Sequence, residues 1–169
     1  VSIADRSGCG LYTGRLLEGV KIAPSPEWMQ KRLLACGLRP ISNVVDITNY
    51  ILLELGHPLH AFDAAKVAGK KVAVRRAQAG EVMRTLDGGE RKLDPEVLVI
   101  ADAGGPVAVA GVMGGASSEI GASTAAVFLE AAWFDPIRVR RGSVALGLTT
   151  ESSYRFERGA DIGISDWAS

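Results

Sequence analysis

The sequence predicts an α+β fold in which central β-sheets, arranged like a sandwich, are flanked by helices. Three observations support this prediction. Helix signals cluster in the first third of the chain and near its end, short β-type runs fill the middle, and several of those runs are apolar on both faces. Strands that are apolar on both faces need other layers of the structure packed on both sides. With 169 residues and no repeat or linker, residues 1–169 are expected to form one domain.

Two helices are predicted in the first third of the chain. Ser25 can cap the segment "PEWMQKRLLAC", Pro26 suits its first turn, and Gly37 can end it. Ser42 can cap a second helix, which ends at Gly56.

The middle of the chain reads as strands separated by turn residues such as "DGG", "DAGG" and "GGASSEIGAS". The β-type runs cover residues 70–77, 81–86, 91–94, 96–102, 105–115 and 124–134. A third helix, "IRVRRGSVAL", follows Asp135 and Pro136 and closes at Gly147. The tail after it, "TTESSYRFERGADIG", has no clear periodicity.

Composition narrows the class of protein without naming a function. Hydrophobic residues make up 47% and charged residues 22%, and no run approaches the roughly 20 apolar residues of a membrane span. Nineteen basic and nineteen acidic side chains cancel, so no global field attracts nucleic acid. Cys9 and Cys36 lie outside any metal-ligand spacing, which indicates two reduced thiols in a cytoplasmic protein and no metal site.

The second predicted helix carries polar residues where core residues are expected. On a helical wheel Thr48 falls in the middle of the apolar arc, and Asn49 lies between Val45 and Leu53. An unmet buried hydroxyl or amide costs about 1 to 3 kcal/mol, so each needs a partner. Local backbone groups could serve, and so could a ligand.

Two histidines follow in "GHPLHAFD". His60 is expected in a loop that returns toward the helix end, where a neutral imidazole could hold a water or simply pack. His57 abuts a proline at the helix exit and is expected to be exposed.

Glu130 is the one charge in "TAAVFLEAAWF", a run otherwise suited to a buried strand. Burying an ionised carboxylate without partners is costly. It therefore points outward at a strand end, pairs with an arginine of "RVRR", or binds a ligand.

The glycines of "AGVMGG" allow close approach of a backbone or a ligand. They do not form a phosphate loop, because no Lys-Ser or Lys-Thr follows and no GxGxxG opens a helix. GxSxG, HExxH and CxxC motifs are absent as well.

Four blocks nevertheless carry a resemblance when they are taken together in order. They are "SPEWMQKRLLACGLRPISNVVDITNYILLELGHPLHAFD", "AGVMGG", "FLEAAWFDP" and "TTESSYRFERGAD". From about Arg15 to Asp161 the chain resembles the B3/B4 domain, the editing module, of the bacterial phenylalanyl-tRNA synthetase β subunit. The resemblance implies a three-layer B3/B4 fold excised from a longer β subunit. It also implies hydrolysis of Tyr-tRNA(Phe), the mischarged product.

The family's site residues can be carried over to matching positions. Glu130 matches the residue that reads the tyrosine hydroxyl, and Ala110 and Gly111 match a thin pocket wall that a bulky residue would block. The family positions that line the ester end, where side chains hold the attacking water by hydrogen bonds, correspond to Thr48, Asn49 and His60. A further wall is formed by Thr150 and Ser152, the latter standing where many relatives have alanine.

The same resemblance implies partners and cofactors. The expected partners are tRNA(Phe) carrying tyrosine, the synthetase α subunit and the remaining β domains of an α2β2 heterotetramer, with no membrane. No cofactor is expected in this domain, since ATP and magnesium serve the parent synthetase. The competing hypothesis is a non-catalytic module that docks tRNA or a subunit. A third is a domain that keeps its pocket but has no useful activity alone.

Overall fold

The computed structural model describes residues 1–169, which form five α-helices and ten strands. The helices are α1 (Glu27–Ala35), α2 (Asn43–Leu55), α3 (Pro136–Leu146), α4 (Glu151–Phe156) and α5 (Ser165–Ala168). The strands are β1 (Ser2–Ile3), β2 (Cys9–Glu18), β3 (Leu59–Asp63), β4 (Ala73–Arg76), β5 (Val82–Arg84), β6 (Glu90–Lys92), β7 (Leu98–Asp102), β8 (Gly105–Val109), β9 (Met113–Gly114) and β10 (Ala126–Phe134). No helix combines the length and the apolar character that crossing a bilayer requires.

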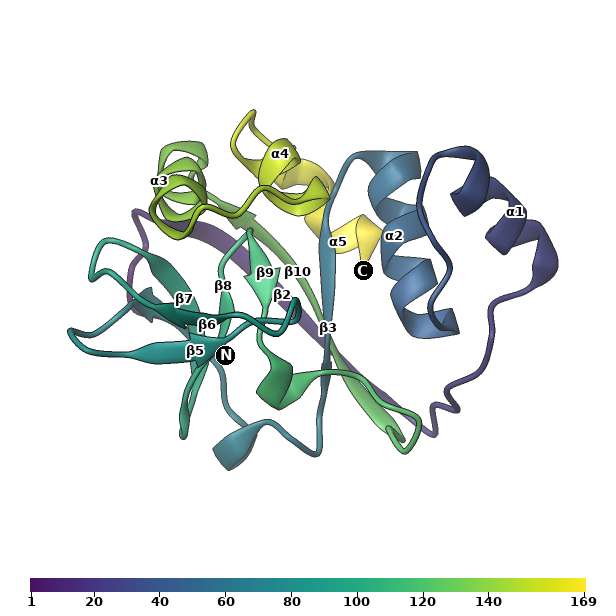
Figure 1. The fold of residues 1–169 in the computed structure, drawn as a ribbon, viewed down its shortest axis with the longest axis horizontal. Coiled ribbons are helices and arrows are strands. Elements are labelled where there is room, and N and C mark those ends of the chain that lie inside the picture. The colour runs from purple at the N-terminus through teal and green to yellow at the C-terminus, as the bar shows by residue number, and fades with distance from the viewer.

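The strands form three sheets. A five-stranded sheet has the order β1-β4-β7-β8-β9, a three-stranded antiparallel sheet has the order β2-β10-β3, and β5 pairs with β6. The three-stranded sheet crosses the middle of the molecule, with the five-stranded sheet on one side and α1 and α2 on the other (Figure 1). The predicted α+β class, with central sheets flanked by helices, is confirmed.

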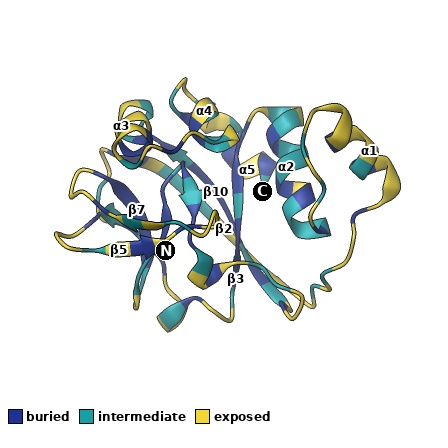
Figure 2. Cartoon of the chain, in the orientation of Figure 1, coloured by how far each residue is buried: buried dark blue, intermediate teal, exposed yellow.

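Strand β10 is the middle of this arrangement and packs on both faces. Val127, Leu129 and Ala131 point into a cluster of six buried residues beneath α2 and α5. Ala132 and Phe134 point the opposite way, into the main core of 22 buried residues shared with the five-stranded sheet. The buried colouring of β10 and β7 reflects this double cover (Figure 2).

Helix ends follow the expected stop residues more closely than the expected caps. Gly56 and Gly147 end α2 and α3 in left-handed conformations, with φ of 69° and 61°. Ser25 does not cap α1, because Pro26 occupies the N-cap position and the Ser25 hydroxyl donates to Oδ2 of Asp46 at 2.6 Å. That prediction was wrong because the serine is used by a tertiary contact with α2.

Strand β2 and helix α4 are among the elements that the sequence did not predict. Strand β2 is an edge strand that is largely exposed and includes Gly10 and Gly14, so it lacks the alternation of a half-buried strand. Helix α4 has only six residues, too few for a periodic pattern, and is set by the capping box of Thr150 and Ser153.

Candidate functional site

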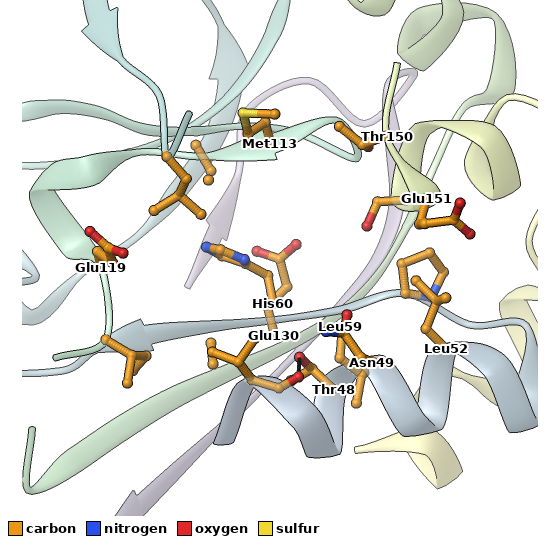
Figure 3. Close-up of a pocket in the computed structure, with 18 of the residues that line it drawn as sticks. Thr48, Asn49, Leu52, Leu59, His60, Met113, Glu119, Glu130, Thr150 and Glu151 are labelled. Carbon is orange, nitrogen blue, oxygen red and sulfur yellow. Dashed lines mark hydrogen bonds between the residues drawn. The ribbon is translucent and has the colours of Figure 1, made fainter. Parts of the chain in front are cut away.

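A cavity of about 600 Å³ lies between α2, β3, the β8–β9 segment and the start of α4 (Figure 3). Most of its lining is apolar, and no lysine or arginine contributes to it. Seven of the eight predicted site residues line this cavity: Thr48, Asn49, His60, Gly111, Glu130, Thr150 and Ser152. Residues from five separate segments, α2, β3, the β8–β9 segment, β10 and the start of α4, therefore converge on one site.

Glu130 is buried, with 5% of its surface exposed, and lies on β10 between Gly14 of β2 and His60 of β3. The Tyr12 hydroxyl donates to its Oε2 at 2.7 Å. Loss of hydration raises the pKa of Glu130 to about 8, although the bond from Tyr12 acts in the opposite direction. The carboxyl group is therefore largely protonated at pH 7.

The alternative that an arginine of "RVRR" neutralises Glu130 is wrong. Arg138, the one arginine of that segment that forms an ion pair, contacts Glu96 at 2.8 Å. The outward-pointing alternative is wrong as well, because the carboxyl group is enclosed by the sheet and the cavity.

His60 lies in strand β3 and not in a loop, so that expectation is corrected. The segment "LHAFD" pairs with β10, and this register sets His60 directly opposite Glu130. Its ring packs edge-on against Phe62, with centroids 4.5 Å apart. Burial lowers the pKa of His60 to about 4, so the imidazole is neutral at pH 7.

The polar residues of α2 face the cavity. The Thr48 hydroxyl donates to the carbonyl of Val45 at 2.7 Å, as the local-backbone alternative proposed, and Thr48 also lines the cavity. Asn49 is half-buried and points toward the same space (Figure 3). The amide of Asn49 is the freer of the two groups to meet a ligand.

The thin-wall expectation needs correction at Ala110. Ala110 is 1% exposed and belongs to the main core, so it does not line the cavity. Gly111 does line the cavity, and an added Cβ there would meet Val139 of the main core and Phe156, another residue of the cavity lining. That Cβ would lie 2.9 Å from Cγ2 of Val139 and 3.1 Å from Cδ2 of Phe156. With φ of 70°, the backbone of Gly111 also disfavours any other residue.

The α4 wall is fixed by Thr150. Its Oγ1 accepts from the Ser153 amide at 3.0 Å and donates to the Val112 carbonyl at 2.8 Å, which ties the helix to the β8–β9 segment. Ser152 follows in the first turn and lines the cavity, half-buried.

His57 is fully buried, not exposed as expected. Its ring packs edge-on against Phe156 at 6.2 Å between centroids, and burial lowers its pKa. The short turn after Gly56 brings the ring back under α4 instead of releasing it to solvent.

Several residues of the site were not anticipated. Gly114 lies against the edge of the His60 ring, and Tyr12 holds Glu130. Glu119 and Glu151 are exposed residues of the cavity lining. The sequence indicated that a glycine of "AGVMGG" could lie against a ligand or a side chain, but it did not indicate that this glycine is Gly114. No cluster of three or more metal-ligating side chains occurs in the chain.

A fold of this kind around such a cavity defines a known class of domain. The family model described as the B3/4 domain matches residues 8–169, and the chain belongs to that family. A crystal structure of an N-terminal fragment of the phenylalanyl-tRNA synthetase beta subunit from Pyrococcus horikoshii shares the fold, with a TM-score of 0.58 and 12% identity. The match covers 89% of this chain and 48% of that one.

Curated relatives give a more particular likeness, to the beta subunit of phenylalanine–tRNA ligase. The protein from Anaeromyxobacter dehalogenans is 60% identical over 97% of this chain, and the one from Moorella thermoacetica is 56% identical over 96%. The chain spans about a fifth of the length of these relatives, since 20% of each is covered.

Proposed function

We propose that this domain is the editing site of a phenylalanine–tRNA ligase β subunit and hydrolyses the ester of Tyr-tRNA(Phe). The observation that carries the proposal is Glu130, a buried carboxyl group with no charged partner at the edge of an apolar cavity of about 600 Å³. A polar group in such a place has a large unmet demand for a hydrogen bond.

Discrimination between tyrosine and phenylalanine follows from that demand. A phenol hydroxyl both donates and accepts, so it can bond Glu130 in either protonation state of the carboxyl group. Phenylalanine would fill the same volume and leave Oε1 of the carboxyl group without a partner, since Tyr12 bonds only Oε2. A site built to hydrogen-bond a hydroxyl rejects the analogue without it far more strongly than an apolar pocket rejects an added hydroxyl.

The hydrolytic step needs positioning more than strong acid or base chemistry, because an aminoacyl ester is already activated. Asn49, Thr48 and His60 are proposed to hold the attacking water and the ester group. The neutral ring of His60 can donate at one nitrogen and accept at the other. Since His60 lies opposite Glu130, both act from neighbouring strands, whereas Asn49 and Thr48 act from α2.

The remaining parts of the synthetase are proposed to deliver the substrate. The cavity lining contains no lysine or arginine to bind phosphates, so the tRNA must be held elsewhere in the proposed α2β2 enzyme. Charging, with its ATP and magnesium, belongs to those other parts. A cytoplasmic location is proposed on the same grounds, because charging of tRNA for protein synthesis takes place there.

The test is deacylation of Tyr-tRNA(Phe) by the intact synthetase carrying Glu130→Ala. Hydrolysis should fall strongly, while Glu119→Ala, which removes an exposed carboxylate from the same cavity, should leave it near wild type. An undiminished rate in the Glu130 variant would remove this residue from the site. If Asn49→Ala and His60→Ala changed tRNA affinity but not hydrolysis, the domain would be a docking module.

A further inference from the structure

Tyr12, on the edge strand β2, is the residue that hydrogen bonds to Glu130. In the β2–β10 register Tyr12 is opposite Ala132, while Gly14 is opposite Glu130. Tyr12 is thus the diagonal neighbour of Glu130 on the same face of the sheet. From there its hydroxyl reaches Oε2 at 2.7 Å.

The ring of Tyr12 is held by packing that depends on a missing side chain. A Cβ at Gly14 would lie 2.5 Å from Cζ of Phe128, so the Phe128 ring can lie across this position only because residue 14 is glycine. There it stacks on Tyr12, with centroids 6.5 Å apart and planes 15° apart. Phe62 also packs against Phe128, with ring centroids 6.1 Å apart. The hydroxyl of Tyr12 therefore has little freedom to leave Glu130.

We propose that Tyr12 is a positioning residue for tyrosine recognition, which fixes the Glu130 carboxyl group by occupying Oε2 and leaves Oε1 for the substrate hydroxyl. This inference rests on the function proposed above. A carboxyl group fixed in one orientation presents a single hydrogen-bonding atom at a defined place, and a freely rotating one must be ordered when the substrate binds. Tyr12 is proposed to act through Glu130 and not on the ester.

The expected loss follows from one hydrogen bond. Removing the Tyr12 hydroxyl should lower kcat/KM for Tyr-tRNA(Phe) about tenfold, the factor that corresponds to about 1.4 kcal/mol. Hydrolysis of Phe-tRNA(Phe), which makes no bond to Glu130, should not change. Tyr12→Phe keeps the ring and its stack on Phe128, so the packing argument is not disturbed.

A pH profile separates positioning from a purely structural role. The Tyr12 bond lowers the pKa of Glu130, so its loss should move the Glu130-linked midpoint to higher pH. Two other titratable groups face Glu130, Cys9 from β2 and His60 from β3. Their pKa values of about 12 and about 4 keep both uncharged between pH 5 and 9. A midpoint in that window that vanishes in Glu130→Ala therefore belongs to Glu130.

The experiment compares the intact synthetase with Tyr12→Phe, Glu130→Ala and the double variant. Tyr154→Phe is the control, because that ring is exposed and its hydroxyl bonds nothing in the chain. We expect Tyr12→Phe to cost about tenfold alone and nothing further in the Glu130→Ala background. Equal losses in both backgrounds, or wild-type hydrolysis with an unshifted midpoint, would overturn the role of Tyr12. Wild-type hydrolysis by Glu130→Ala would instead overturn the proposed function.

Discussion

Replacing Gly114 by alanine should displace the His60 ring without altering any polar group. An added Cβ would lie 2.4 Å from Cε1 and 2.6 Å from Nε2 of His60. Ordinary contacts between such atoms begin near 3.4 Å, so the ring must move by about 1 Å. Misplacement of a catalytic group by about 1 Å can cost on the order of 100-fold in rate. We therefore expect Gly114→Ala to reduce hydrolysis of Tyr-tRNA(Phe) by the intact synthetase by about that factor.

The assay is single-turnover deacylation of Tyr-tRNA(Phe), with aminoacylation of tRNA(Phe) by phenylalanine measured in parallel. Gly121→Ala is the matched control, because Gly121 lines the same cavity and a Cβ there meets nothing within 4 Å. It should hydrolyse at the wild-type rate. If Gly114→Ala did so too while folding normally, the position of the His60 ring would not matter to the reaction, and the reasoning from geometry would fail.

Three further outcomes are expected. Glu130 has its pKa raised from 4.5 to about 8, so its contribution to stability falls as pH rises from 4.5 to 8. His60 has its pKa lowered from 6.5 to about 4, so its contribution to stability is lost as pH falls from 6.5 to 4. Between pH 6.5 and 8 the Glu130 effect alone remains, at up to about 1.4 kcal/mol per pH unit. Glu130→Gln should abolish this slope in urea unfolding of the 169-residue chain; an unchanged slope would assign it elsewhere. Deacylation by wild type should show no inflection near pH 6.5 from His60, and an imidazole titration near 6.5 by NMR would contradict this. Gly111→Ala should lower the free energy of unfolding by about 2 to 4 kcal/mol through its left-handed backbone and overpacking against Val139. Gly80 has φ of 84° and open space around it, so Gly80→Ala should lower the free energy of unfolding only through the strain of its backbone.

What the sequence could predict was what local chemistry determines. Glu130 stood out because a single charge in an apolar strand violates the burial rule wherever the strand lies. Gly56 and Gly147 ended helices because a left-handed stop depends on the residue at that position. Thr48 and Asn49 were recognisable from the helical wheel, because their position relative to the apolar arc depends only on residues of the same helix. The resemblance of the four sequence blocks then supplied the family, which the B3/4 match confirms.

What could not be predicted was set by pairing between distant segments. Tyr12 and Glu130 are 118 residues apart, and their contact exists only because β2 pairs with β10 in one register. His60 was misplaced because its strand is specified by the same sheet and not by the loop-like sequence around Pro58. The orientation of Gly111 depends on a backbone angle that the sequence allows but does not state.

The register of β10 therefore determines the chemistry of the whole site. Side chains alternate across a strand, so a slip of one residue would carry Glu130 to the α2 face and put Leu129 into the cavity. The present register is held by apolar residues on both sides of β10, including Val127 on one face and Phe134 on the other, both at zero exposure. Glu130 is thus kept in place by its apolar neighbours on β10. If these neighbours changed faces, the carboxyl group would be buried among apolar side chains. The cost of burying one carboxyl group beside the cavity is offset by the same packing that gives the domain its core.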